Sequence, residues 1–164
     1  MRQLWAAALV ATAAAFELAS FTYSAGEGLL TLTFDEAVQS RTLNASGIVL
    51  QSNATAERAP MQRFRLRGAH PTLGQFLYTT PYNTTETLTL VMRDDDLLEV
   101  QALSDLAVDA KSVWLVAEEG LARAVSDNDR SAAITKPLEV DTYVPDTLQS
   151  EMELYTIDMH EGLI

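Results

Sequence analysis

The fold is decided by residues 19–34, which read ASFTYSAGEGLLTLTF. Two β-prone runs flank a glycine-containing turn at residues 24–28, and this arrangement is a signal for a β-hairpin. In the second run Leu30, Leu32 and Phe34 alternate with threonines, so the three apolar side chains share one face of the strand. The pattern predicts a hairpin with one face on a hydrophobic core and the other toward solvent.

The same two-residue alternation recurs along the rest of the chain. It appears at residues 63–67, 87–92 and 138–144, while residues 48–50 form a short strand and residues 112–116 another β-rich run. About seven strands at such spacing predict an all-β fold, an antiparallel β-sandwich. Adjacent Trp114 and Leu115 can both be interior only if their strand is covered on both faces. The predicted interior side chains are Leu30, Leu32, Phe34, Phe64, Leu66, Leu88, Leu90, Trp114 and Leu115.

One segment departs from the strand pattern. After the aspartates at residues 94–96, apolar residues recur at 97, 100 and 103, which is helical spacing. Aspartates at the start of a helix accept hydrogen bonds from its free amide groups and oppose the positive end of its dipole. We therefore predict one short helix from about Asp95 to Ser104, inserted between two strands.

Composition excludes several classes of function. The 164 residues include 23 acidic and 11 basic side chains, a net charge of −12, no cysteine and two histidines. An acidic surface repels nucleic acid and anionic lipid, so neither is expected as a partner. Without cysteine, disulfides, thiolate metal sites and cysteine nucleophiles are excluded. With only His70 and His160, histidine-based catalysis is nearly excluded as well, and we do not expect an enzyme or a cofactor.

The first fifteen residues have the pattern of a secretory signal peptide. Arg2 precedes an apolar run, and alanines at 13–15 supply small residues at a cleavage site. The run is too short to span a bilayer, so membrane insertion is not expected. The alternative is an alanine-rich helix packed on the domain. Three glycosylation sequons, at Asn44, Asn53 and Asn83, agree with a secreted glycoprotein.

The end of the chain repeats its beginning. Glu161-Gly162-Leu163-Ile164 matches Glu27-Gly28-Leu29-Leu30 at an offset of 134, because 161 − 27 = 134, and the apolar residues before each stretch match too. We therefore expect a module over residues 16–144, a linker over 145–151, and the first hairpin of a following repeat over 152–164. A chance match of three residues is the alternative.

The chain resembles a known class of repeat. Residues 28–38, GLLTLTFDEAV, are followed by Thr42-Leu43, by Ile48-Val49-Leu50-Gln51 and later by Pro145-Asp146-Thr147. This pattern is similar to Ig-like repeats of large extracellular surface proteins of algae and other protists, including flagellar-hair (mastigoneme) proteins. It is distantly similar to Ig-like modules of bacterial surface-layer and adhesion proteins. The resemblance covers most of residues 16–144.

The resemblance implies an Ig-like sandwich and a structural role at a cell or flagellar surface. Neighbouring repeats, or copies of the same chain in a filament or surface layer, are the implied partners. The repeats carry a late Asp-x-x-Gly-Asn turn, whereas this chain has Ser126-Asp127-Asn128-Asp129 there, without the glycine. That departure weakens the case for an ion site in this turn.

Two aspartate clusters are candidate calcium sites. Calcium binds six to eight oxygen ligands, and extracellular modules use it at domain edges. The alternatives are helix capping for the first cluster and an aspartate-rich turn for the second, and neither matches an EF-hand loop. The candidate ligands are Asp94, Asp96, Asp127 and Asp129.

Three arginines form a candidate interaction stripe. Arg63, Arg65 and Arg67 alternate with Phe64 and Leu66, so on a strand they share one face. Such a stripe could bind a sulfated glycan or an acidic neighbouring copy. The alternative is an edge strand whose charges prevent pairing with other sheets.

The sequence therefore favours a noncatalytic structural or assembly module over other functions. The alternative is an adhesion or glycan-binding module that could depend on calcium. A pocket lined by aromatic side chains or carboxylates would favour binding, whereas contacts between the ends of successive modules would favour assembly.

Overall fold

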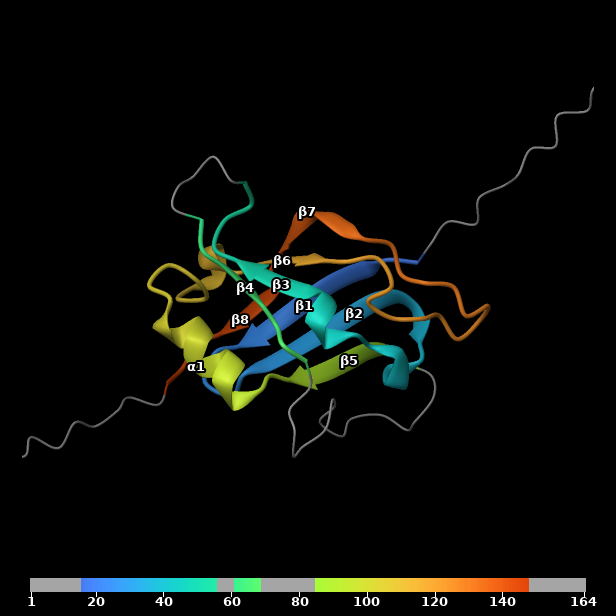
Figure 1. Ribbon diagram of the computed structural model, residues 1–164, viewed down its shortest axis with the longest axis horizontal. Coiled ribbons are helices and arrows are strands. Elements are labelled where there is room, and N and C mark those ends of the chain that lie inside the picture. Colours follow the sequence, from blue (N-terminus) through green and yellow to red (C-terminus); the bar gives the residue numbers. More distant parts are fainter. Residues whose placement is uncertain (1–15, 56–60, 69–84, 148–164) are drawn as a thin grey trace, which may run out of the picture.

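Two four-stranded sheets pack face to face in the computed structural model, which describes residues 16–55, 61–68 and 85–147 (Figure 1). The predicted all-β sandwich with one helix is confirmed at this level. Eight strands are present in the described residues rather than about seven, because the last predicted strand is divided in two. The strands are β1 (Leu18–Ser24), β2 (Leu29–Val38), β3 (Ile48–Gln51), β4 (Arg63–Arg65), β5 (Thr85–Val91), β6 (Trp114–Ala117), β7 (Ile134–Glu139) and β8 (Thr142–Val144). The helices are α1 (Asp94–Ala102) and three short 3₁₀ turns, η1 (Ser40–Thr42), η2 (Ala45–Gly47) and η3 (Ala110–Ser112).

The first sheet has the strand order β5-β2-β1-β8 and contains the predicted hairpin. β1 and β2 pair antiparallel, with Tyr23 opposite Leu30. Gly28 closes the turn with a φ of +62°, a conformation that glycine adopts at little cost. The Gly28 carbonyl then accepts a hydrogen bond from the amide of Met92 at 2.9 Å, at the end of β5. The hairpin prediction is confirmed.

The second sheet has the order β4-β3-β6-β7, and the chain crosses from it to the first sheet just before β8. The Val140 amide donates to the Val113 carbonyl, beside β6, at 3.2 Å. The next amide, of Asp141, donates to the Phe21 carbonyl of β1 at 2.9 Å. β8 then runs parallel to β1, with Tyr143 opposite Tyr23. This change of sheet is what divides the last predicted strand into β7 and β8.

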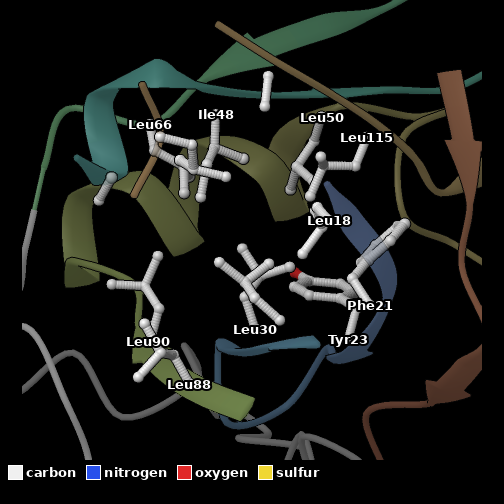
Figure 2. Close-up of a cluster of buried hydrophobic side chains, with 14 of the residues drawn as sticks. Leu18, Phe21, Tyr23, Leu30, Ile48, Leu50, Leu66, Leu88, Leu90 and Leu115 are labelled. Carbon is white, nitrogen blue, oxygen red and sulfur yellow. The ribbon is translucent and has the colours of Figure 1, made fainter. Parts of the chain in front are cut away.

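The core lies between the two sheets (Figure 2), where side chains from both converge. Eight of the nine predicted interior residues are buried, and the prediction for Trp114 is wrong. Leu115 is fully buried opposite Leu50, whereas Trp114 is partly exposed opposite Gln51 on the outer face. Because adjacent strand residues point to opposite faces, only one of the two could enter the core.

The helix forms close to where it was predicted, but it is shorter. α1 spans Asp94–Ala102, and its backbone becomes extended at Leu103, with φ −85° and ψ 120°. Val100 is buried in the core, and Leu97 packs over Gly28, where a Cβ added to the glycine would lie 3.1 Å from Leu97 Cδ2. The helix therefore covers the end of the β1–β2 hairpin. Within the described residues no helix is long and apolar enough to cross a membrane.

The described chain begins and ends at opposite ends of the sandwich (Figure 1). The N-terminal pole contains Phe16 and Glu17 together with residues 35–39 and 124–129; its contacts include a bond from the Glu17 amide to Asp35 Oδ1 at 2.8 Å. The C-terminal pole contains the turn at 25–28, α1, Ala107, Val108 and residues 144–147; the Ala25 amide donates to the Val144 carbonyl at 2.9 Å. β1 connects the two poles.

The proposed leader (1–15) and following hairpin (152–164) lie outside the described residues, and both stay predictions. Of the predicted linker, 145–151, the structure describes the first three residues, which are exposed. β8, the last described strand, ends at Val144, and the predicted boundary between modules stays a prediction.

Candidate functional site

The arginine stripe lies on an exposed edge of the second sheet. Arg63, Arg65 and Arg67 are exposed, while Phe64 and Leu66 between them are buried, as the alternation predicted. Among the described strands β4 pairs with β3 alone, so it is the edge strand of the sheet in the part of the chain that the structure describes. Charged side chains on an edge strand oppose pairing with another sheet, so the position also fits the protective role considered for the stripe.

Two of the three arginines are neutralised within the chain. Arg65 Nη1 lies 2.7 Å from Glu118 Oε1 and also donates to the Ser46 carbonyl at 3.1 Å. Arg67 forms an ion pair with Glu99 of α1. The hydrogen bond and charge of Glu99 raise the pKa of Arg67 above its ordinary value. The pairs connect β4 to its neighbours and leave fewer positive charges for an external anion.

Arg63 is different, because its guanidinium has no hydrogen-bond or ion-pair partner within residues 16–55, 61–68 and 85–147. It lies directly opposite Gln51 in the β3–β4 pairing. Gln51 is buried, and its Nε2 donates to the Asn53 carbonyl at 2.6 Å, but its Oε1 has no hydrogen-bond partner among the described residues. Arg63 is therefore the cation of this stripe that is available to an external group.

A shallow hollow of about 290 Å³ opens beside Arg63 on the outer face of the second sheet. Its floor is formed by Val49 of β3 and Val116 of β6, two partly exposed residues opposite each other. Arg63 and Arg65 line one side and Ile134 of β7 the other. We call this surface the sheet hollow. Val49, Arg63, Arg65 and Val116 lie on predicted strands, whereas Ile134 precedes the last predicted strand. No sequence pattern predicts the order of these strands in the sheet.

The first aspartate cluster divides between the core and the surface. Asp96 is fully buried, and its Oδ2 accepts a hydrogen bond from the Arg67 amide at 2.9 Å. Asp94 and Asp95 are exposed, and Asp95 lies 3.5 Å from Arg93. The two candidate ligands Asp94 and Asp96 therefore differ in their surroundings, one exposed and the other buried. Asp96 holds the end of β4 against the first turn of α1.

Replacing Asp96 with alanine is expected to lower the free energy of unfolding by about 2 kcal/mol, because the Arg67 amide loses a charged acceptor and the helix loses a favourable charge at its N-terminus. The matched control is Asp95→Ala, which removes an exposed ion pair and should change stability by less than about 0.5 kcal/mol. Urea unfolding measures both. Equal losses for the two variants would contradict the structural role of Asp96.

The second aspartate cluster forms a turn at the N-terminal pole. Asp127 Oδ1 accepts a hydrogen bond from the Asp129 amide at 3.0 Å, and Asn128 between them has a φ of +64°. Such a bond across two residues is typical of an aspartate turn. This turn and α1 lie at opposite poles. Within the described residues no group of three or more His, Cys, Asp or Glu side chains is placed to hold a metal ion. Calcium binding stays a prediction from the sequence alone.

The sequons differ in their surroundings. Asn44 is exposed, and its Oδ1 accepts a hydrogen bond from Ser46 Oγ at 2.7 Å. Asn53 is partly exposed after β3, and Asn83 lies outside the described residues. Asn44 lies close to Gly47, which lines the sheet hollow; a Cβ added to Gly47 would lie 3.8 Å from Asn44 Nδ2. A glycan on Asn44 would therefore stand at the rim of the hollow.

A second depression, of about 370 Å³, opens at the C-terminal pole. Tyr23, Val100, Val108, Tyr143 and Pro145 contribute to its lining. Tyr143 donates its hydroxyl to the Ala107 carbonyl at 2.9 Å. The buried Tyr23 hydroxyl has no partner in the described residues, and burial, with a contribution from Tyr143, raises the pKa of Tyr23 to about 12.

Exposed large apolar side chains gather at the poles. Among the described residues, Leu98, Val108 and Val144 lie at the C-terminal pole and Val125 at the N-terminal pole. Leu98 is the most exposed, at 65%. Exposed apolar side chains of this kind are candidate contact surfaces, and in the described residues they lie at the ends of the sandwich.

The chain matches no family model, no curated protein and no solved structure.

Proposed function

We propose that this chain is a noncatalytic Ig-like module that serves as a structural unit of an extracellular protein built from successive modules. One observation carries the proposal: the described chain enters at one pole of the sandwich and leaves at the other (Figure 1). A module of this shape places its neighbours end to end rather than side by side. Such a unit extends a filament or surface layer with each repeat.

The order of the strands supports an Ig-like fold. Immunoglobulin constant-type sandwiches place strands A, B, E and D in one sheet and C, F and G in the other. If β1, β2 and β5 correspond to A, B and E, and β3, β6 and β7 to C, F and G, both sheets agree in order. β4 lies beside β3, where variable-type domains add a strand. β8 carries the last strand back to the first sheet, beside β1.

The pairing of β1 with β8 suits a unit that bears tension. The chain enters through β1 and leaves through β8, and these strands are parallel neighbours. Tension between the poles therefore pulls β1 and β8 in opposite directions along their length. The hydrogen bonds between them, such as Ala25 N–H to the Val144 carbonyl at 2.9 Å, are then loaded together rather than one after another.

The extracellular part of the proposal rests on sequence features. The signal-peptide pattern, the three sequons and the resemblance to flagellar-hair and surface-layer repeats all point to secretion. Neighbouring repeats and further copies of this chain are the proposed partners. A glycan-binding role is the weaker candidate, because Arg65 and Arg67 are already paired with Glu118 and Glu99.

Pulling single molecules in two directions tests this function. The chain has no cysteine, so pairs of introduced cysteines define the points of attachment. Glu17→Cys with Thr147→Cys loads β1 against β8 along their length, whereas Glu17→Cys with Asp141→Cys loads β8 from its other end. All three sites are exposed. We expect a clearly higher unfolding force for the first pair. Equal forces, or a lower force for the first pair, would contradict a load-bearing arrangement.

A further inference from the structure

Two surfaces of opposite character remain open on this molecule. One is the outward face of α1, where Leu98 is 65% exposed and no other described large apolar side chain is more exposed. Asp94 and Asp95 precede Leu98 by four and three residues, so the three side chains share one face of the helix. Glu99 is excluded from this face, since it is hydrogen-bonded to Arg67 of the same chain. Asp95 lies 3.5 Å from Arg93 in an ion pair in which the Asp95 side chain is 68% exposed, and such an exposed pair is weak enough to be exchanged for another cation. We call this surface the helix face; it is apolar at its centre and acidic at its N-terminal end.

The other surface is the sheet hollow, which is apolar at its floor and basic at its side. Val49 and Val116 are partly exposed there, although the sheet buries its other face in the core. Arg63 at its rim has no partner within the described residues, whereas Arg65 beside it is paired with Glu118. A volume of about 290 Å³ is enough for one large aliphatic side chain with room at its edges. The hollow is therefore complementary to a surface with a protruding apolar side chain and a carboxylate next to it.

We propose that the sheet hollow binds the helix face of a second copy of this chain. Leu98 of one copy covers Val49 and Val116 of the next, and Asp95 lies toward Arg63. The helix face of this chain itself presents the required combination of an apolar side chain and a nearby carboxylate. The internal pairing of Arg65 and Arg67 leaves Arg63 as the one cation of the stripe without a partner among the described residues. One cation for each site suits a single carboxylate better than the repeated charges of a sulfated glycan.

The two surfaces are different parts of the molecule, so the contact is heterologous. A copy that uses its helix face still presents an open hollow, and the contact therefore propagates into rings or open chains rather than closing at a dimer. This association deepens the proposed structural role and rests on it, because it supplies the lateral or longitudinal partner that an assembly module needs. The pulling experiment uses single molecules, so it can succeed or fail independently of this contact.

Sedimentation velocity of the full chain, produced without glycosylation, tests the contact. We expect the weight-average sedimentation coefficient to rise with concentration up to about 1 mM. Leu98→Glu disrupts the helix face and Arg63→Glu the hollow; each should lower the association constant by about tenfold or more. Ala19→Glu, at an exposed residue of β1 in the first sheet, is the matched control and should leave association unchanged. All three positions are exposed, and circular dichroism and thermal melts check that each variant is folded.

Mixing the two disrupted variants is the decisive step. The Leu98→Glu chain keeps an intact hollow and the Arg63→Glu chain keeps an intact helix face, so an equimolar mixture should form a one-to-one complex that grows no further. A double variant, Asp95→Arg with Arg63→Glu in the same chain, reverses both charges, leaves Leu98 in place and should restore the association that either single charge reversal weakens. The proposal is overturned if the wild-type chain shows no association, if both single variants associate as the wild type does, or if the mixture fails to form the complex.

Discussion

Replacing Leu115 with alanine is expected to lower the free energy of unfolding by about 3–4 kcal/mol, a loss typical of a fully buried leucine in a packed core. Leu115 lies on β6 between Leu50 of β3 and Leu138 of β7, so the surrounding strands cannot move in to fill the space. Trp114→Ala should have a smaller effect, about 1–2 kcal/mol, although tryptophan is the larger side chain. Trp114 is partly exposed, and its indole donates only one hydrogen bond, to the Lys111 carbonyl at 3.0 Å.

Urea unfolding followed by far-ultraviolet circular dichroism measures both variants without relying on tryptophan fluorescence. Val116→Ala is a useful control, because Val116 points to the same outer face as Trp114. This variant should also lower the free energy of unfolding only slightly. A larger loss for Trp114→Ala than for Leu115→Ala would mean that β6 is shifted by one residue. Such a shift would reverse every side chain on the strand and would remove Val116 from the sheet hollow.

Stability is expected to fall by about 2–3 kcal/mol between about pH 10 and about pH 12 because of Tyr23. Burial raises the pKa of this phenol to about 12 in the folded chain, compared with about 10 in an unfolded chain. Between these two values the unfolded chain releases the proton and the folded chain keeps it. The unfolded state is thereby favoured as the pH rises, so the stabilising contribution is complete below pH 10 and is lost through pH 12.

Tyr23→Phe removes this dependence and isolates it from other alkaline effects. The difference in the free energy of unfolding between wild type and variant should be small at neutral pH. The buried Tyr23 hydroxyl has no hydrogen-bond partner among the described residues, so its removal breaks no hydrogen bond there. Phenylalanine can even stabilise the fold slightly. Above pH 10 the Tyr23→Phe variant should become increasingly more stable than the wild type. Burial also raises the pKa of Tyr143. Tyr143 is present in both chains, so its own titration cancels from the difference in stability between them. Parallel pH profiles for the two chains would contradict the burial of Tyr23.

The local features of the fold could be predicted from the sequence. Alternation in residues 29–34 fixed which face of β2 meets the core, and the glycines at 26 and 28 placed the turn. The same reasoning placed Phe64 and Leu66 inside and the three arginines outside. These features depend on neighbouring residues of one strand, for which period and turn chemistry are sufficient.

Features that depend on distant partners could not be predicted. Alternation permits either Trp114 or Leu115 to face the core, and the choice comes from Leu50 on β3 and Leu138 on β7. The pairing of Arg65 with Glu118 and of Arg67 with Glu99 joins residues more than thirty positions apart. The sheet hollow depends on the order β4-β3-β6-β7, which no pattern in one segment specifies.

The change of sheet between β7 and β8 was also missed, for a related reason. Residues 138–144 alternate without interruption, so they predict a single strand. In the structure the Val140 amide donates a hydrogen bond to the segment before β6, and the Asp141 amide donates one to β1. Two successive amides are therefore hydrogen-bonded to different sheets. Nothing in the residues at that point marks the transfer. Yet this transfer places β8 beside β1 and directs the chain out of the C-terminal pole.

The proposed structural role depends on the chain entering and leaving the sandwich at opposite poles (Figure 1). Pulsed electron–electron double resonance between spin labels tests it most directly, since the chain has no cysteine to remove. Labels at Glu17 and Thr147 should give a single narrow distribution centred beyond about 26 Å, the length of eight strand residues from Glu17 to Ala25. Pairs within one pole, Glu17 with Ser126 and Val108 with Thr147, should give clearly shorter distances. A Glu17–Thr147 distance as short as those of the same-pole pairs would contradict the claim.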